Sequence, residues 1–224
     1  SEKAKLLILC NPQNPIGKIW NKEDLSEIGR LCEKHHVTVL SDEIHGEITK
    51  PGSSYIPFLS VNETNRKIGF AAISVTKAFN IAGIHTSAII IPNEELRNKV
   101  NRQLNTDECA EPNIFAIPAS IAALNDSCDW LEEMREYVEK NKEYVYQFIK
   151  ENIPTFKAIE QDATYLMWLD VSSLTNDDKE FASFLRKETG LFLTAGSVYG
   201  KGGEGFLRMN VATSFSNVKD ACCR

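Results

Sequence analysis

The sequence predicts an α/β fold, with a doubly wound, parallel-rich sheet followed by a smaller α+β domain. Residues 6–9 form a short apolar run that stops at Asn11 and Pro12, which is typical of a buried strand ending in a loop. Residues 22–36 carry apolar side chains at the spacing of an amphipathic helix, and residues 37–40 form a second buried strand. A strand, a helix and a strand joined by short connections form a βαβ unit, which predicts a parallel sheet.

The remaining elements of the first part continue this alternation of strands and helices. Asn21 is expected to cap the helix over residues 22–36, because its side chain can accept a hydrogen bond from the first turn. The further elements are strands over residues 69–74 and 87–91 and helices over residues 94–104 and 114–124. A long amphipathic helix over residues 130–152 then ends just before Pro154.

The sequence pattern changes after Pro154. The predicted elements are a strand over residues 164–171, a helix over residues 179–189, and strands over residues 191–194 and 206–211 around a glycine-rich loop. Gly190 follows the helix as a typical C-cap. We therefore expect two domains: residues 1–127 belong to a large α/β domain, and residues 128–224 form a bridging helix and a small α+β domain.

Composition narrows the possible classes of function. Of the 224 residues, 42% are hydrophobic and 25% are charged, which is typical of a folded globular protein. The formal net charge of −6 argues against nucleic-acid binding. No apolar run approaches the ~18 residues of a membrane helix, so we expect a soluble, cytoplasmic protein with no membrane partner. The six cysteines include no C-x-x-C pair, so we expect free thiols and no metal site.

Three polar clusters directly follow three of the predicted strands. These clusters are Asn11–Gly17, Ser41–His45 and Ser74–Lys77. Because ligands of open parallel sheets bind beyond the carboxyl ends of the strands, we expect the clusters to share one crevice. Strand alternation also predicts that Glu43 points to the face opposite Asp42.

The clusters combine an amide, a carboxylate and an amine. Lys77 in such a crevice suggests imine chemistry with a carbonyl cofactor. Asp42 suits a protonated pyridine nitrogen, and the hydroxyls of Ser74 and Thr76 suit a phosphate. Together these groups meet the demands of pyridoxal 5′-phosphate (PLP), which needs a Schiff-base lysine and a carboxylate that keeps the ring an electron sink.

The motifs resemble those of fold-type I PLP-dependent enzymes of the class I/II aminotransferase superfamily. Asn11–Gly17 resembles the N-P-x-N-P-x-G loop, Ser41–His45 the S-D-E-[IV]-[YH] strand end, and Ser74–Gly83 the lysine motif. Ala163–Asp170 resembles the small-domain strand, and Gly196–Asn210 the segment that carries the substrate-carboxylate arginine. The resemblance spans nearly the whole chain. It implies the C-terminal part of a fold-type I PLP-dependent transferase, with an N-terminal part that precedes this chain.

The resemblance implies a role for each matched residue. The cofactor-binding residues would be Asn14, Asp42, His45, Ser74, Thr76 and Lys77. Among them, Lys77 would hold PLP covalently and later move protons, Asp42 would pair with the pyridine N–H, and Asn14 would hydrogen-bond the ring oxygen. Arg208 would bind the α-carboxylate of an amino-acid substrate through a bidentate fork, which a lysine ammonium cannot reproduce.

Two departures from a generic aminotransferase indicate one branch of the superfamily. His45 stands where many aminotransferases have tyrosine, and His85 where many have a phosphate-binding arginine. Together with Ile56–Phe58, these residues resemble the cystathionine β-lyase-like C–S lyases. The implied reaction is α,β-elimination of cystathionine or another cysteine thioether to a thiol, pyruvate and ammonia.

The sequence leaves two alternative functions open. One is a PLP-dependent class I/II aminotransferase, and the other is an inactive fragment or regulatory binding protein of the same fold. The resemblance also implies that a missing N-terminal part supplies a phosphate loop, an aromatic ring that stacks on the cofactor, and residues that reach across a dimer interface. We therefore expect this chain to be a fragment of an enzyme that is a homodimer at full length.

Overall fold

The computed structural model describes residues 4–224 and divides them into two compact units. The first unit contains residues 4–13 and 18–133, and the second contains residues 14–17 and 134–224. The division falls within the long helix α6 (Cys128–Asn152). None of the helices in the described part of the chain combines the length and apolarity that spanning a bilayer requires.

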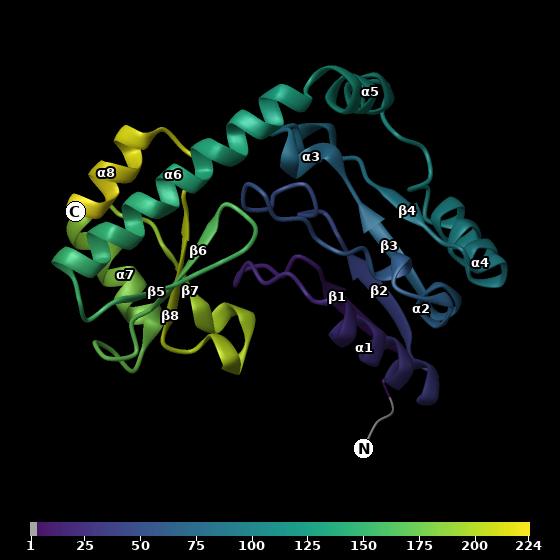
Figure 1. Ribbon diagram of the computed structural model, residues 1–224, viewed down its shortest axis with the longest axis horizontal. Coiled ribbons are helices and arrows are strands. Elements are labelled where there is room, and N and C mark those ends of the chain that lie inside the picture. The colour runs from purple at the N-terminus through teal and green to yellow at the C-terminus, as the bar shows by residue number, and fades with distance from the viewer. Residues whose placement is uncertain (1–3) are drawn as a thin grey trace. The chain divides into compact units, whose positions relative to one another are not determined.

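The first unit is an α/β unit built on a four-stranded sheet (Figure 1). Its elements are β1 (Leu6–Cys10), α1 (Lys22–Lys34), β2 (Thr38–Asp42), α2 (Glu63–Ile68), β3 (Gly69–Ile73), α3 (Val75–Ala78), β4 (Ala88–Ile90), α4 (Glu94–Thr106) and α5 (Ala116–Asp126). The strand order is β1-β2-β3-β4, with β1, β2 and β3 parallel and β4 antiparallel. The predicted βαβ unit is therefore confirmed, and the parallel strands all end at one edge of the sheet.

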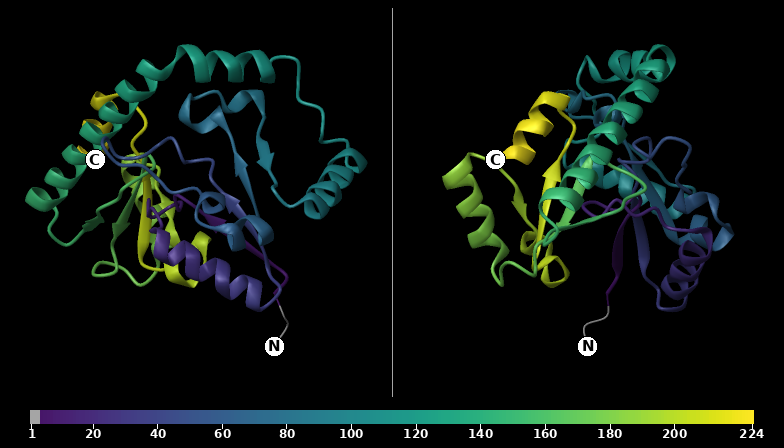
Figure 2. Two further views of the ribbon diagram at one scale, coloured as in Figure 1. Left: turned by 45° about the vertical axis from the view of Figure 1, so that its right-hand side comes forward. Right: turned by 60° about the vertical axis from the view of Figure 1, so that its left-hand side comes forward.

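Helix α1 begins as its sequence predicts. The side chain of Asn21 accepts a hydrogen bond from the backbone N–H of Asp24 at 2.7 Å, which satisfies one of the donors left free at a helix start. Leu25 of this helix is fully buried and packs in a core with Val39 of β2 and Phe58. The two further views of Figure 2 also show α1 beside the sheet.

Strand β1 differs from the expected buried strand. Leu9 is buried, but Ile8 is 61% exposed and Leu6 is 48% exposed. Successive side chains of a strand point to opposite faces, and only one face of β1 contributes to the core that α1 covers. The apolar run therefore predicted the strand correctly but overestimated its burial.

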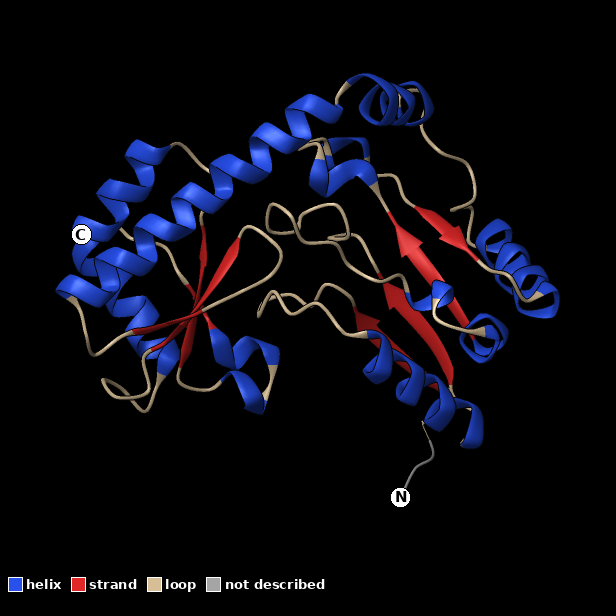
Figure 3. Cartoon of the chain, viewed as in Figure 1, coloured by secondary structure: helices blue, strands red, loops and turns tan. Residues whose placement is uncertain are grey.

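The second unit is an antiparallel sheet packed against helices (Figure 3). Besides the C-terminal part of α6, its elements are β5 (Lys157–Ile159), β6 (Leu166–Asp170), α7 (Asp178–Thr189), β7 (Thr194–Ala195), β8 (Phe206–Asn210) and α8 (Phe215–Cys223). The strand order is β5-β6-β8-β7. Side chains from the helices, such as Val145, Ala182 and Val218, share one core with Met167 and Leu207 of the sheet.

Two details of this unit differ from the sequence prediction. The strand expected over residues 191–194 is wrong except for Thr194, because the paired segment is Thr194–Ala195. Leu193 is nevertheless buried in the core, so its apolar character reflects packing rather than strand pairing. Strand β5 was not predicted, since Lys157–Ile159 has only three residues and one of them is charged. The C-cap at Gly190 is confirmed, with a φ of 74°.

Candidate active site

The first polar cluster begins at a buried asparagine at the end of β1. The Asn11 backbone N–H donates to the carbonyl oxygen of Asp42 at 2.9 Å, which extends the β1–β2 pairing by one residue. Its side-chain Nδ2 donates to the carbonyl oxygen of Ile56 at 2.8 Å. Asn11 therefore joins the end of β1 to the segment around Ile56, and this fully buried side chain is an anchor rather than a ligand-binding group.

Asp42 lies at the end of β2, between the ends of β1 and β3. In the sheet register it stands opposite Cys10 on one side and Ala72 on the other. Its carboxylate Oδ1 accepts the backbone N–H of Ile44 at 3.3 Å, and no cation of the described residues pairs with it. His45 follows three positions later and is buried, with its carbonyl oxygen accepting the N–H of Ile48 at 2.9 Å.

The third cluster follows β3 and forms a tight hydroxyl pair beside a lysine. Ser74 caps the short helix α3, and its Oγ accepts the backbone N–H of Thr76 at 3.1 Å. The hydroxyls of Ser74 and Thr76 lie 2.7 Å apart, and the Ser74 hydroxyl also donates to the carbonyl oxygen of Thr86 at 2.7 Å. Lys77 lies within α3, is partly exposed, and has no ion pair or hydrogen bond from its amine in the part of the chain that the structure describes.

Glu43, next to Asp42, is a buried carboxyl with three hydrogen-bond donors. It is 4% exposed, and its Oε1 accepts the hydroxyl of Ser41 at 2.7 Å and the backbone N–H of Phe58 at 2.8 Å. The hydroxyl of Tyr55 donates to Oε2 at 3.3 Å. Burial raises the pKa of Glu43 above its ordinary value, although these three hydrogen bonds act in the opposite direction. Strand alternation predicts only the face to which Glu43 points and does not predict these hydrogen-bond partners.

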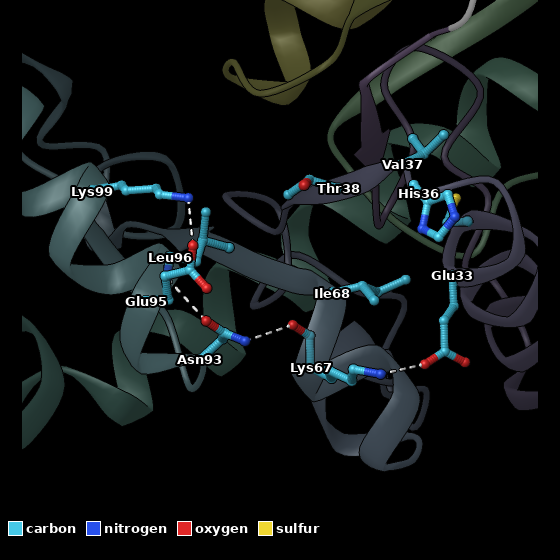
Figure 4. Close-up of a pocket in the computed structure, with 11 residues that line it drawn as sticks. Glu33, His36, Val37, Thr38, Lys67, Ile68, Asn93, Glu95, Leu96 and Lys99 are labelled. Atoms are coloured by element: carbon cyan, nitrogen blue, oxygen red, sulfur yellow. Dashed lines mark hydrogen bonds and ion pairs between the residues drawn. The ribbon is translucent and has the colours of Figure 1, made fainter.

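Two hollows of the first unit lie at opposite edges of its sheet. One, of about 250 Å³, is lined by Glu43, Tyr55 and Ser74 among others, at the carboxyl ends of β2 and β3. The other, of about 330 Å³, lies at the amino end of β2 and is shown in Figure 4. There Lys67 pairs with Glu33 at 2.9 Å, so the larger hollow is lined by charges that already have partners.

Asn14 belongs to the second unit, where residues 14–17 are held by the segment before β6. The side-chain Nε2 of Gln161 donates to the carbonyl oxygen of Pro15 at 2.9 Å, and the N–H of Asp162 donates to the carbonyl oxygen of Gly17 at 3.2 Å. Gly17 has a φ of +63°, and a Cβ there would lie 2.5 Å from a neighbouring carbonyl oxygen, so only glycine fits. The Oδ1 of Asn14 is buried without a hydrogen-bond partner among the described residues.

Arg208 lies on β8, opposite Trp168 of β6 and Thr194 of β7. Its neighbours along the strand, Leu207 and Met209, point into the core, so Arg208 occupies the other face of the sheet. The guanidinium lies 5.4 Å from the centre of the Tyr199 ring, and no carboxylate of residues 4–224 pairs with it. A partly exposed guanidinium without an anion partner can receive one from a ligand.

Within the first unit, the donor set of the carboxyl edge fits PLP. An amine, a carboxylate and a pair of hydroxyls come from the ends of adjacent parallel strands, and neither charged group has an ion partner within that unit. In the second unit, the Arg208 guanidinium has no anion partner among the described residues, and its Nη2 makes only a long contact of 3.5 Å with the Thr194 hydroxyl. Unpaired charges and buried polar atoms are costly in a folded protein, and they are retained where a ligand satisfies them.

The structure brings together only some of the residues that the sequence singled out. Asp42, Ser74, Thr76 and Lys77 follow neighbouring strands of the first unit. Asn14 and Arg208 belong to the second unit. The sequence did not predict that Asn11, Glu43 and Gln161 hold the surrounding segments in place through hydrogen bonds of their side chains. For Glu43 a signal was available, because a second acidic residue directly after a strand needs donors if it is buried.

Comparisons with known proteins identify the kind of chain that carries this site. The family model described as aminotransferase class I and II matches residues 1–224. A curated relative, cystathionine beta-lyase PatB of Bacillus subtilis (strain 168), is 39% identical over 219 residues, which cover 98% of this chain and 57% of the relative.

Two solved structures give the same picture in three dimensions. Cystalysin from Treponema denticola, whose structure contains a pyridoxal 5′-phosphate cofactor, superimposes with a TM-score of 0.94 at 30% sequence identity. The match covers 97% of this chain and 55% of the cystalysin chain. The PLP-bound C–S lyase from Staphylococcus hominis has a TM-score of 0.88 at 31% identity and covers 98% and 57%, respectively. This chain therefore spans a little over half the length of these proteins.

Proposed function

This chain belongs to the aminotransferase class I and II family and has the fold-type I architecture of PLP-dependent enzymes, and on that basis we propose that it acts in a PLP-dependent C–S β-lyase. The proposed reaction is the α,β-elimination of cystathionine or another cysteine S-conjugate to a thiol, pyruvate and ammonia. The observation that carries the proposal is the amine, the carboxylate and the hydroxyl pair at the carboxyl ends of β2 and β3, where neither charged group has an ion partner among the described residues. The relatives named as C–S lyases support this choice of reaction.

The residues of the carboxyl edge would hold the cofactor. We assign covalent attachment to the Nζ of Lys77, pairing with the pyridine N–H to Asp42, and contact with the phosphate to Ser74 and Thr76. The Ser74 hydroxyl already donates within the protein, so it would turn or share its proton to bind phosphate. His45 would lie near the ring. When bound, PLP supplies an electron sink for the pair left at the substrate Cα.

Lys77 has a second role in the proposed reaction. Once its amine is free of the cofactor, it would take the proton from Cα of the substrate and act as a general base. The Cβ–S bond then breaks, and the sulfur leaves with the bonding pair as a thiolate. This role suits Lys77 because no carboxylate of the described residues holds its amine in an ion pair.

The second unit would supply two further groups. Arg208 would bind the α-carboxylate of the substrate through two parallel hydrogen bonds, for which its planar fork is suited. Asn14 would donate its side-chain amide to the ring oxygen of the cofactor, and the Gln161 contact would keep its loop in place. We further propose that residues 1–127 form part of the large cofactor-binding domain and that residues 128–224 form the bridging helix and small domain.

An aminotransferase is the second candidate, because the matched family model is named for that activity. The lyase is favoured because His45 and His85 stand where many aminotransferases have tyrosine and arginine. His85 is exposed and ends the short 3-10 helix Ala82–Ile84 with a φ of 44°, so it lies outside the core. We also propose a cytoplasmic homodimer as the full-length assembly.

The two candidates differ in their need for a second substrate. The purified full-length holoenzyme would be given cystathionine with and without 2-oxoglutarate, and pyruvate, thiol and glutamate would be measured. Pyruvate formed at the same rate without the keto acid supports the lyase. Glutamate as the dominant product across several thioethers would replace it with the aminotransferase. Absence of both products from a PLP-loaded protein would favour a regulatory binding protein.

A further inference from the structure

The carboxyl of Glu43 is bound from three directions, although it takes no direct part in the proposed chemistry. Its three donors come from β2 and from residues 55–58, a segment that lies outside any strand. A buried carboxyl with this many donors fixes the groups around it, because losing one would leave a buried polar atom unpaired. Glu43 therefore ties the end of β2 to the segment beside it.

The backbone around Glu43 is held just as firmly on both sides. The N–H of Glu43 donates to the carbonyl oxygen of Ala72 at 2.9 Å, and the carbonyl oxygen of Asp42 accepts the N–H of Asn11 at 2.9 Å. Asn11 in turn donates from its side chain to the carbonyl oxygen of Ile56. A closed path of hydrogen bonds thus runs from β1 through residues 56–58 to Glu43 and back to the Asp42 peptide.

From this geometry we propose that Glu43 is a positioning residue, which sets the direction of the neighbouring Asp42 carboxylate toward the pyridine nitrogen of the cofactor. The inference rests on the proposed function, because it takes Asp42 as the partner of that nitrogen. Within residues 4–224, the Asp42 carboxylate has one weak hydrogen bond, from the N–H of Ile44 at 3.3 Å, so its direction depends on the backbone that carries it. Displacement of a reacting group by about 1 Å can cost roughly a hundredfold in rate.

The test uses the full-length holoenzyme loaded with PLP that carries ¹⁵N at the ring nitrogen. The ¹⁵N resonance reports whether this nitrogen is protonated, and it does so independently of turnover. We expect Glu43→Ala to move the resonance toward the unprotonated position and to lower kcat about tenfold to a hundredfold with little change in KM. Glu43→Gln keeps an acceptor for the Phe58 N–H and should restore both values.

Asn65 provides a matched control on the same segment. It is fully buried, and its Nδ2 donates to the carbonyl oxygens of Leu25 and Phe58 at 3.2 and 3.1 Å. Asn65→Ala should therefore loosen Phe58 and lower Tm, as Glu43→Ala does, while the ¹⁵N resonance stays at the wild-type position. A role of Glu43 in stability alone predicts the same wild-type resonance and kcat for both variants, and that result would overturn the proposal.

Two further variants keep the outcome decisive. If Glu43→Ala does not fold, the milder double variant Ser41→Ala, Tyr55→Phe removes two of the three donors, and it must shift the resonance in the same direction or the proposal fails. Asp42→Asn separates the inference from its premise. If the Asp42→Asn variant keeps the wild-type resonance, the proposed role of Asp42 is contradicted. If the resonance shifts in Asp42→Asn but not in Glu43→Ala, only the positioning role of Glu43 is contradicted.

Discussion

The two edges of the sheet in the first unit both carry lysines, which have ion partners at one edge and none at the other within the described residues. At the amino edge, Lys67 pairs with Glu33 at 2.9 Å and Lys99 with Glu95 at 2.6 Å. At the carboxyl edge, Lys77 has no ion partner within the described residues. The hollow at the amino edge has a volume of about 330 Å³, and the one lined by Glu43 and Ser74 has a volume of about 250 Å³.

In the proposed function, the reactive lysine is the one without an ion partner, rather than the one beside the larger of these two hollows. A lysine that is paired and largely exposed contributes a weak surface ion pair. A lysine left unpaired beside hydroxyls and near the end of a strand that carries a carboxylate is available for covalent chemistry.

The largest effect is expected for Lys77→Ala. This variant removes both the point of cofactor attachment and the proposed base, so kcat for pyruvate release should fall by at least about 10³-fold. Lys99→Ala, at the amino edge, should keep the wild-type rate and serves as the control. Steady-state pyruvate assays on the two full-length variants make the comparison, and equal losses would show that the edges do not differ.

A smaller but still large effect is expected for Asp42→Asn. The amide keeps the shape of the side chain but cannot hold a proton on the pyridine nitrogen, and loss of one pre-organised electrostatic contact costs about 10²- to 10³-fold in kcat. Pre-steady-state kinetics of the holoenzyme would measure the loss. A variant with the wild-type rate would remove Asp42 from the proposed chemistry.

A moderate effect is expected on the pH dependence of stability. Because burial raises the pKa of Glu43, its folded state binds a proton more tightly than its unfolded state does. The stability it contributes is therefore present at pH below the unfolded pKa, near 4.5, and is lost as the pH rises through the higher folded pKa. Urea unfolding should show the wild type losing more stability than Glu43→Gln between pH 5 and pH 7. A parallel loss in both proteins would mean that another group titrates.

The smallest effect is expected at the amino edge. Lys67 and Glu33 are 69% and 40% exposed in their side chains, so Lys67→Met should change the free energy of unfolding by less than about 1 kcal/mol. Activity should remain within about twofold of wild type. Chemical denaturation and the pyruvate assay measure the two values. A strong loss of activity would contradict the assignment of the active site to the carboxyl edge.

Much of the fold could be predicted from local sequence signals. The apolar run at residues 6–9 and the cap at Asn21 depend on neighbouring residues, and both led to the correct elements. Residues 191–194 failed because burial of Leu193 comes from packing in the core, which a local pattern cannot separate from strand pairing. The family and the PLP-dependent class were also predicted from the motifs, and the family match confirms them.

The site was harder to predict where it depends on contacts between distant residues. Asp42, Ser74 and Lys77 follow strands, so the parallel order of β2 and β3 was enough to place them at one edge. The partners of Glu43 are up to 15 residues away and include a backbone N–H, and those of Gln161 are 146 residues away. Contacts of this kind follow from the tertiary fold and leave no periodic signal in the sequence.

The most direct test of the account is to find which lysine carries the cofactor. The full-length holoenzyme would be reduced with borohydride, which fixes the imine as a stable amine, and then digested and mapped by mass spectrometry. The account predicts a single pyridoxyl adduct on Lys77 at the carboxyl edge, with Lys67 and Lys99 unmodified. An adduct on either of those amino-edge lysines, with Lys77 unmodified, would contradict it.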